Sequence, residues 1–282
     1  MTENVSVPRV AALRSHAACA RGHVALLGAA VLAAAVSGCA QDTGTPDFSG
    51  VWSTNSVDTL DSPWWDIVGA FSCRCAAESY DVLDALLNDP ANDALDAEQI
   101  VARLAEHTSA IIAARLTDRG RRIGEGFDLA DDPAIQCERF NAFRTALHSD
   151  PITFEILGDR IVIRGEDLTV DRTVWMDGRA HPDTVEGPGG HSIGWFEGDT
   201  LVVETVHVPP GLVDDQLQIH SSDQARSVER YRVTHDGHQL YADFTLYDPV
   251  MLEAPLTIVR PRVLTPNVEL DRAPCEVIAG QF

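Results

Sequence analysis

Two histidines are the residues in this sequence best suited to catalysis. His191 lies among Gly189, Gly190 and Gly194, and glycines let the backbone bend sharply and another group approach closely. His220 is followed by two serines and an aspartate. An imidazole has a pKa near neutrality and is the usual general acid or base in proteins. The two histidines are therefore the predicted catalytic residues, with the alternative that each is a hydrogen-bonded structural residue in a turn.

A second group of polar side chains is suited to binding a ligand. A guanidinium can hold a carboxylate through two hydrogen bonds, and a carboxylate that ends an apolar strand can face a barrel lumen. The predicted ligand-binding residues are Arg172, Arg179, Arg230, Glu204 and His181. The alternative is that the arginines form buried ion pairs with glutamates and that Glu204 is a solvated strand end.

Other kinds of site fit the sequence poorly. Ser192 or Ser221 can be drawn into a Ser-His-Asp triad, but neither lies in a nucleophile-elbow sequence. His181, His191 and His220 lack the short spacing of metal ligands, so no metal site is predicted. Glycine patterns for phosphate loops or dinucleotides do not occur, and no cofactor is predicted. All 21 cationic residues are arginine, which excludes chemistry through a lysine Schiff base.

The charge balance excludes two classes of partner. The chain of 282 residues carries 21 cationic and 43 acidic side chains, a formal net charge of −22. Nucleic-acid binding requires a cationic surface, so nucleic acid is not a predicted partner. Docking to a membrane through a polybasic face is excluded for the same reason.

The N-terminus has the pattern of a bacterial export signal. Three arginines precede an apolar run from Val24 to Val36, which has the length of a signal-peptide core and is too short for a comfortable membrane span. The run ends in Val-Ser-Gly-Cys39, which resembles a bacterial lipoprotein box. Residues 1–38 are therefore the predicted signal peptide and Cys39 the predicted lipidation site, with residues 39–46 as a tether. An ordinary signal peptide cleaved after small residues is the alternative.

The lipoprotein resemblance implies a location. It implies export across the inner membrane, and Ala40 after the cysteine favours anchoring to the outer membrane with the protein facing the periplasm. Removal of residues 1–38 leaves 18 arginines and 42 acidic residues, a formal charge of −24. The membrane is thus a predicted partner only through lipid on Cys39.

Cysteine usage agrees with an oxidising compartment. Cys73, Cys75, Cys137 and Cys275 remain after the predicted signal and lipidation site, and four thiols allow three pairings. Cys137–Cys275 is the favoured disulfide because it would fasten the end of the chain to its middle. Cys73 and Cys75 are separated by one residue, which strains a mutual bridge and leaves a redox or metal role open.

Helical patterns occupy the region from about 62 to 120. A helical pair is predicted over residues 79–118, with a capping box at Asp96 and Gln99 that starts the second helix. The pair is either a hairpin packed on the remaining structure or a lid or partner-binding face.

The rest of the chain, over residues 47–282, is predicted to form one mainly β domain. Gly50-x-Trp52 resembles the first strand of lipocalin-like barrels. Gly-Asp or Asp-Gly turns lie inside three apolar stretches, residues 156–163, 195–203 and 231–244, and such turns are typical of β-hairpins. Three hairpins without intervening helices predict an antiparallel meander, as a lipocalin-like barrel or curved sheet with a helical hairpin inserted.

Several phrases between Asp128 and Cys275 resemble a family of uncharacterised secreted bacterial proteins. The matching phrases are Asp131-Asp132-Pro133, Arg172-Thr173, Asp177-Gly178-Arg179-x-His181-Pro182, Gly190-His191-Ser192-Ile193-Gly194, Glu197-Gly198-Asp199-Thr200-Leu201-Val202-Val203-Glu204-Thr205, His220-Ser221 and Glu229-Arg230-Tyr231. They cover roughly half of the chain in order. The resemblance implies secretion but no activity.

Three classes of function are compatible with these patterns. The first is an envelope lipoprotein whose barrel binds a small, partly apolar ligand. The second is an acid–base enzyme on the same barrel, a lyase, isomerase or hydrolase that uses His191 and His220. The third is an envelope protein that binds a partner through its helical hairpin. Convergence of both histidines and an arginine in one pocket would favour the enzyme, and an apolar pocket with a single polar anchor would favour ligand binding.

Overall fold

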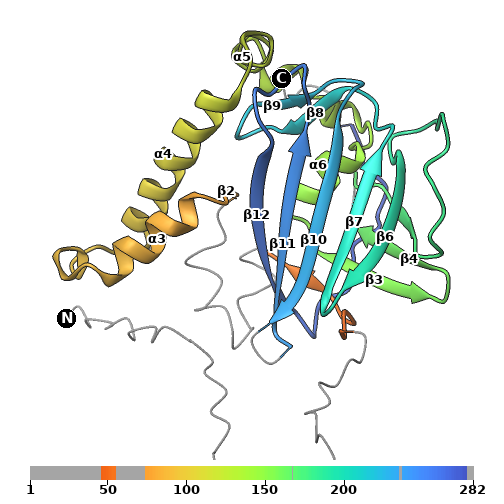
Figure 1. Ribbon diagram of the computed structural model, residues 1–282, viewed down its shortest axis with the longest axis horizontal. Helices are drawn as coiled ribbons and strands as arrows, with labels where there is room; N and C mark the ends of the chain where they lie inside the picture. Colours follow the sequence, from red (N-terminus) through yellow and green to blue (C-terminus); the bar gives the residue numbers. More distant parts are fainter. Residues whose placement is uncertain (1–45, 55–73, 167, 235–236, 278–282) are drawn as a thin grey trace, which may run out of the picture. The chain divides into compact units, whose positions relative to one another are not determined.

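The computed structural model describes residues 46–54, 74–166, 168–234 and 237–277 (Figure 1). The predicted signal peptide, Cys39 and Cys73 lie outside the described residues. Over the described part of the chain, every helix is too short or too polar to cross a bilayer.

Nine strands close into a β-barrel, because the first strand pairs with strands at both ends of the sheet. In spatial order the strands are β1 (Trp52–Ser53), β3 (Ile152–Leu157), β4 (Arg160–Gly165), β5 (Arg172–Trp175), β6 (His191–Glu197), β7 (Thr200–Val206), β10 (Arg226–Thr234), β11 (Gln239–Tyr247) and β12 (Leu256–Leu264). A further strand, β2 (Cys75–Ala76), pairs with β12. The mainly β, barrel-like prediction is confirmed.

The three predicted hairpins are β3–β4, β6–β7 and β10–β11. Gly158 and Gly198 occupy the turns of the first two hairpins with φ of +50° and +64°, a conformation that glycine adopts without steric cost. One pairing differs from a simple meander, since β5 and β6 run parallel. A parallel pair needs a long connection, and residues 176–190 provide it.

Helices α3 (Ser79–Asn88) and α4 (Ala97–Arg115) form the predicted helical pair. The predicted capping box is present, because the Asp96 carboxylate accepts from Gln99 N and the Gln99 side chain accepts from Asp96 N. Ile112 of α4 joins the main apolar core, and the Arg115 guanidinium donates to Pro255 O at 2.6 Å. These contacts favour the hairpin packed on the barrel over a free lid.

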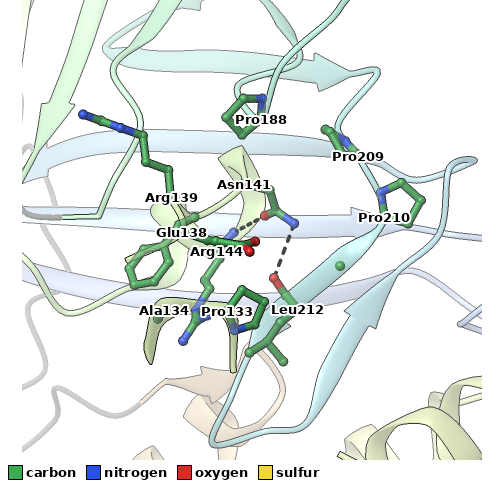
Figure 2. Close-up of a pocket in the computed structure, with 12 residues that line it drawn as sticks. Pro133, Ala134, Glu138, Arg139, Asn141, Arg144, Pro188, Pro209, Pro210 and Leu212 are labelled. Atoms are coloured by element: carbon green, nitrogen blue, oxygen red, sulfur yellow. Dashed lines mark hydrogen bonds between the residues drawn. The ribbon is translucent and has the colours of Figure 1, made fainter. Parts of the chain in front are cut away.

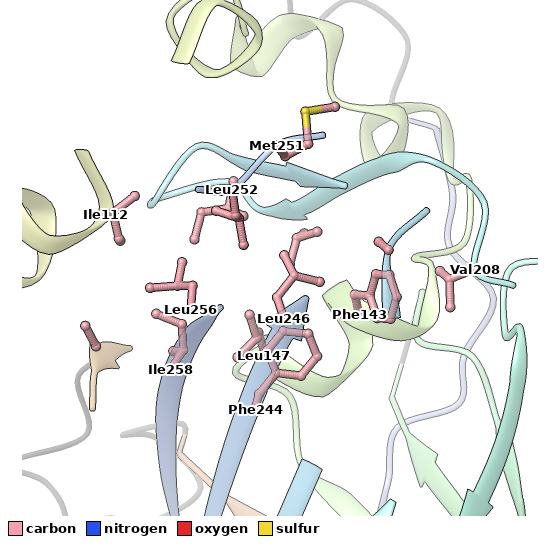
Figure 3. Close-up of a cluster of buried hydrophobic side chains, with 14 of the residues drawn as sticks. Ile112, Phe143, Leu147, Val208, Phe244, Leu246, Met251, Leu252, Leu256 and Ile258 are labelled. Atoms are coloured by element: carbon pink, nitrogen blue, oxygen red, sulfur yellow. The ribbon is translucent and has the colours of Figure 1, made fainter. Parts of the chain in front are cut away.

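The interior of the barrel is filled by side chains and by a short helix that the sequence did not predict. Helix α6 (Ala142–Leu147) places Phe143 and Leu147 against Phe244 and Leu246, which point inward from β11 (Figure 3). A second apolar cluster, which includes Trp52, Phe154 and Leu201, fills another part of the interior. The remaining elements are α5 (Asp118–Glu125), the short 3₁₀ helices η2 (Pro90–Asn92), η3 (Leu129–Asp131) and η4 (Pro133–Gln136), and a two-stranded sheet of β8 (Gly211–Asp214) and β9 (Ile219–Ser221).

Candidate functional site

A buried polar network occupies part of the barrel interior. Arg172 and Glu229 form two hydrogen bonds, Nη1–Oε1 at 2.5 Å and Nη2–Oε2 at 2.6 Å, and each side chain is only 1% exposed. The Tyr231 hydroxyl donates to Glu229 and accepts from Arg172 at 3.1 Å, and Ser227 Oγ donates to Glu229 at 3.3 Å. Arg172 therefore belongs to the ion-paired arrangement that the sequence left as an alternative to ligand capture.

Electrostatics keep the Arg172 guanidinium charged despite its burial. Burial by itself lowers the pKa of Arg172, but the Glu229 carboxylate and the Tyr231 hydroxyl outweigh burial and raise that pKa above its ordinary value. Burial raises the pKa of Tyr231, and Glu229 raises it further. The phenol is therefore a neutral hydrogen-bond donor to Glu229 at physiological pH.

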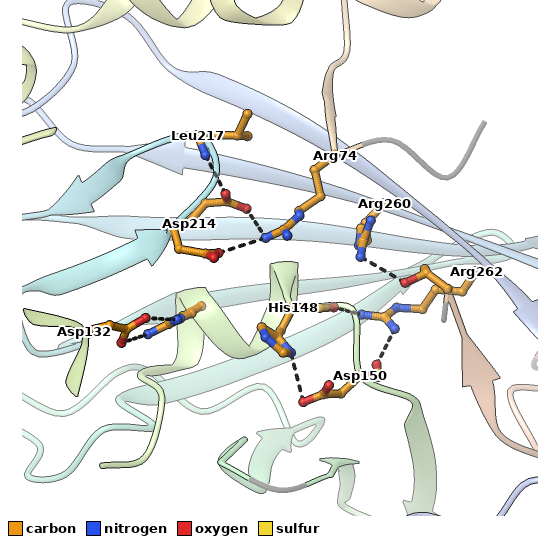
Figure 4. Close-up of polar contacts among 11 residues, drawn as sticks. Arg74, Asp132, His148, Asp150, Asp214, Leu217, Arg260 and Arg262 are labelled. Atoms are coloured by element: carbon orange, nitrogen blue, oxygen red, sulfur yellow. Dashed lines mark hydrogen bonds and ion pairs between the residues drawn. The ribbon is translucent and has the colours of Figure 1, made fainter. Parts of the chain in front are cut away.

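Other arginines that are mostly shielded from solvent join α6, the neighbouring loops, the β8–β9 sheet and the barrel to one another (Figure 4). Arg262 of β12 donates to Asp150 O at 2.6 Å and to His148 O at 2.7 Å, next to the end of α6. Burial lowers the pKa of Arg262 to about 10. Arg144 of α6 holds Asp132 through two hydrogen bonds of 2.7 and 2.6 Å, and Arg74 pairs with Asp214 at 2.7 Å. These arginines bind other groups of the protein, so their role is to hold the elements together.

On the outer face of the barrel, the structure brings together three of the predicted site residues. The Nδ1 atoms of His181 and His191 are 2.7 Å apart, and His181 Nε2 lies 3.6 Å from a carboxylate oxygen of Glu204. Arg226 Nη1 binds the other oxygen of Glu204 at 3.2 Å. The cluster faces outward because Ser192 and Thr205, the alternate residues on the same strands, are buried and hydrogen-bonded to each other.

The hydrogen bond between the two histidines restricts their protonation. One Nδ1 must donate and the other must accept, so two imidazolium ions cannot keep this contact. Burial lowers the pKa of His191, and the neighbouring His181, Arg179 and His207 lower it further. The folded protein therefore favours a pair that carries at most one positive charge.

This arrangement predicts that acid weakens the fold through His191. The unfolded chain binds a proton at His191 more tightly than the folded protein does. The stability that neutral His191 contributes is therefore fully present when the pH is well above its ordinary pKa of about 6.5, and it is lost as the pH falls through the lowered pKa of the folded state. Between about pH 7.5 and about pH 5.5, wild type should lose more unfolding free energy than His191→Gln, by at most about 1.4 kcal/mol per pH unit.

Urea unfolding at the two pH values measures this difference. His107→Gln is the matched control, because His107 lies on α4 and its ring bonds Ser79 instead of another histidine. Equal pH dependence of wild type and His191→Gln would contradict the assignment of a lowered pKa to His191.

Of the other predicted site residues, Arg179 lies close enough to His191 to lower its pKa but forms its own ion pair, and the rest lie elsewhere. His220 belongs to β9, and its ring packs edge-on against Phe127 at 5.3 Å between centroids. Burial lowers the pKa of His220. Within the described residues, no hydrogen bond or ring contact joins His220 to His191. Arg179 pairs with Asp177 and lies over the Trp175 ring at 3.6 Å, and Arg230 pairs with Glu197 at 2.5 Å on the barrel surface.

A pocket of about 220 Å³ lies where α6 begins, and none of its residues was predicted from the sequence to bind a ligand (Figure 2). Its lining comes from four separate segments: Pro133, Ala134, Glu138, Arg139, Phe140, Asn141, Arg144, Pro188, Pro209, Pro210, Gly211 and Leu212. Asn141 stands between these segments, since its Oδ1 accepts from Arg144 N and its Nδ2 donates to Leu212 O. Pro188 O in turn accepts from Ala142 N. The pocket is mostly apolar with a few polar groups, the usual composition of a small-molecule site.

The predicted disulfide is confirmed, since Cys137 and Cys275 are bonded with their Cα atoms 5.6 Å apart. Cys75 is also disulfide-bonded. A search of the described residues finds no group of three or more histidine, cysteine or acidic side chains placed to hold a metal ion.

Comparisons with known proteins add no family. No model of a protein family matches the chain, and no curated protein matches its sequence.

Proposed function

We propose that this protein is an envelope lipoprotein that binds a small, partly apolar ligand in the pocket beside α6. The observation that carries the proposal is the lining of that pocket, in which four rigid proline rings, Phe140 and Leu212 surround the amide of Asn141. Apolar walls provide most of the binding free energy of a small molecule, and a few fixed polar groups orient it.

The pocket volume limits the size of the ligand. Pockets for drug-sized molecules enclose about 300–1,000 Å³, and the volume here is about 220 Å³. An apolar cavity of about 150 Å³ is large enough for benzene. We therefore expect a ligand the size of one substituted ring. We place it in the pocket beside α6 because packed side chains occupy the described barrel interior.

The two alternative functions have less support. An acid–base enzyme built on His191 and His220 needs both rings at one substrate, whereas His191 contacts His181 on the outer face and His220 packs on Phe127. A partner-binding helical hairpin needs an apolar face exposed to solvent. Among the described side chains of residues 79–118, none of the large apolar ones is strongly exposed.

Blocking the pocket tests the binding proposal. In Gly211→Leu the new Cβ lies 3.4 Å from Asn141 Nδ2 and the rest of the side chain enters the pocket. Overpacking costs about 1–3 kcal/mol, so retained ligand should fall at least about fivefold. Native mass spectrometry of protein isolated from the envelope measures the bound small molecule.

Gly189→Leu is the matched control for this experiment. It makes the same change at a glycine with open space around the new Cβ and without a positive φ. A ligand retained equally by Gly211→Leu and Gly189→Leu would place its site outside this pocket and would overturn the proposal.

The anchor is tested separately. Lipid attachment to Cys39 is supported by the Val-Ser-Gly-Cys sequence after an apolar run of signal-peptide length. In bacterial cells fed an alkyne fatty acid, the wild-type protein should become labelled and sediment with the outer membrane, and Cys39→Ala should lose the label. Cys275→Ala, which also removes one cysteine, should keep it. Labelling that survives Cys39→Ala would contradict lipidation at this residue.

A further inference from the structure

The charged groups around the pocket beside α6 indicate the chemical class of its ligand. Three ionisable side chains line the pocket: Glu138, Arg139 and Arg144. Whether a bound molecule meets a positive or a negative charge depends on which of these groups already has a partner in the protein.

Arg144 is fully engaged with an acidic partner. Both of its Nη atoms bind Asp132 Oδ atoms, at 2.7 and 2.6 Å, and both side chains are about 8% exposed. Its guanidinium also lies over the Phe140 ring at 4.2 Å from the centroid. A bidentate ion pair of this kind leaves little net charge for a ligand.

Arg139 extends away from the other lining residues in Figure 2. Its Nη1 donates to Thr169 O at 3.1 Å, which holds the guanidinium toward the 168–170 segment. The cationic end of this side chain is therefore directed away from a ligand that lies between the prolines.

Glu138 is the remaining charged group. In the described part of the chain, its carboxylate makes no hydrogen bond or ion pair, while its backbone N donates to Pro133 O. In the view of Figure 2 its carboxylate is directed toward Asn141. An ionised carboxylate only accepts hydrogen bonds, so it is complemented by a ligand that carries donors and a positive charge.

The charge of the whole chain acts in the same direction. A formal charge of −22 favours the approach of cations and opposes that of anions. We infer that the pocket binds a small organic cation, an ammonium group on a single-ring apolar body, with Glu138 as its counter-ion and the proline rings against its apolar part. This inference rests on the proposed binding function and specifies its ligand class.

Three probes of matched shape test the inference: benzylammonium, benzyl alcohol and benzoate, which differ chiefly in charge. NMR titration of the purified protein at low ionic strength should give the highest affinity for benzylammonium and the lowest for benzoate. Because exposed ion pairs contribute little, Glu138→Gln should weaken benzylammonium binding only about two- to fivefold. It should leave the affinity for benzyl alcohol unchanged, and added salt should weaken the binding of benzylammonium.

The controls separate this inference from the binding proposal. Glu253→Gln removes an exposed glutamate that does not line the pocket, and it should change no affinity. Failure of benzylammonium to bind, an equal affinity for benzoate, or an unchanged preference in Glu138→Gln would overturn the cation inference alone. If all three probes bound Gly211→Leu as tightly as wild type, the pocket itself would be wrong and both proposals would fail.

Discussion

Glu229→Gln is expected to lower the free energy of unfolding by about 3–5 kcal/mol. The change keeps the shape of the side chain but leaves the Arg172 guanidinium, 1% exposed, without its counter-charge. For a domain of this size the melting temperature should fall by roughly 6–20 °C. Thermal and urea unfolding of the purified variant measure the loss.

Glu197→Gln provides the matched control. It removes an acid from an ion pair with almost the same distance, 2.5 Å to Arg230, but on the surface, where the two side chains are 41–47% exposed. Solvent screens such pairs, so this variant should lose far less stability than Glu229→Gln. Equal losses in the two glutamine variants would contradict the argument that burial determines the cost.

A double variant distinguishes the cost of an unpaired charge from the value of the pair. Arg172→Met with Glu229→Leu replaces both charges by apolar side chains inside an interior that already contains Val174 and Val203. Buried ion pairs often contribute little over an apolar replacement of similar volume. The double variant should therefore be more stable than Glu229→Gln, and a larger loss would mean that the network, with Tyr231 and Ser227, stabilises the fold directly.

Local sequence signals were enough to predict the hairpins and the helical pair. Gly158 and Gly198 mark turns that need positive φ, and Asp96 with Gln99 marks a helix start; each feature depends on residues within a few positions of one another. The closure of the barrel depends instead on β1 meeting β12, more than 200 residues later. No local pattern encodes that contact.

Helix α6 shows a second reason for a missed element. Five of its six residues are buried, so the alternation of apolar and polar positions that reveals a surface helix is lost. Its start was still readable, because Asn141 is a typical N-cap and its side chain accepts from Arg144 N. The start of α6 lines the proposed ligand pocket through Asn141 and Arg144, so missing this helix also meant missing the pocket.

The candidate site could be predicted only in part, because it too depends on contacts between distant segments. Strand alternation shows that Glu229 and Arg230 face opposite sides of the sheet, but their partners lie on β5 and β6, strands that β10 does not pair with. His181 and His191 meet because residues 176–190 return the chain to β6 in parallel with β5. The pocket is lined by prolines from three separate segments, and the sequence around a loop proline does not indicate which distant segments pack against it.

Removal of the Cys137–Cys275 disulfide is expected to have the second large effect. The bond closes a loop with a sequence separation of 138 residues, and a link of this length restricts the unfolded chain strongly. Cys137→Ser with Cys275→Ser should therefore lower the unfolding free energy by about 2–5 kcal/mol. The barrel should remain folded, because both cysteines lie outside its strands, and circular dichroism during urea unfolding measures both properties.

Arg272→Ala tests whether the covalent link itself causes that loss. The same C-terminal segment is also held by Arg272, whose guanidinium donates to Gly165 O at 2.6 Å and to Asp171 at 2.8 Å. A partly exposed contact of this kind is worth about 1 kcal/mol or less, so Arg272→Ala should be much milder than the double serine variant. If the two variants lost equal stability, docking of the segment, and not restriction of the unfolded chain, would explain the contribution of the disulfide.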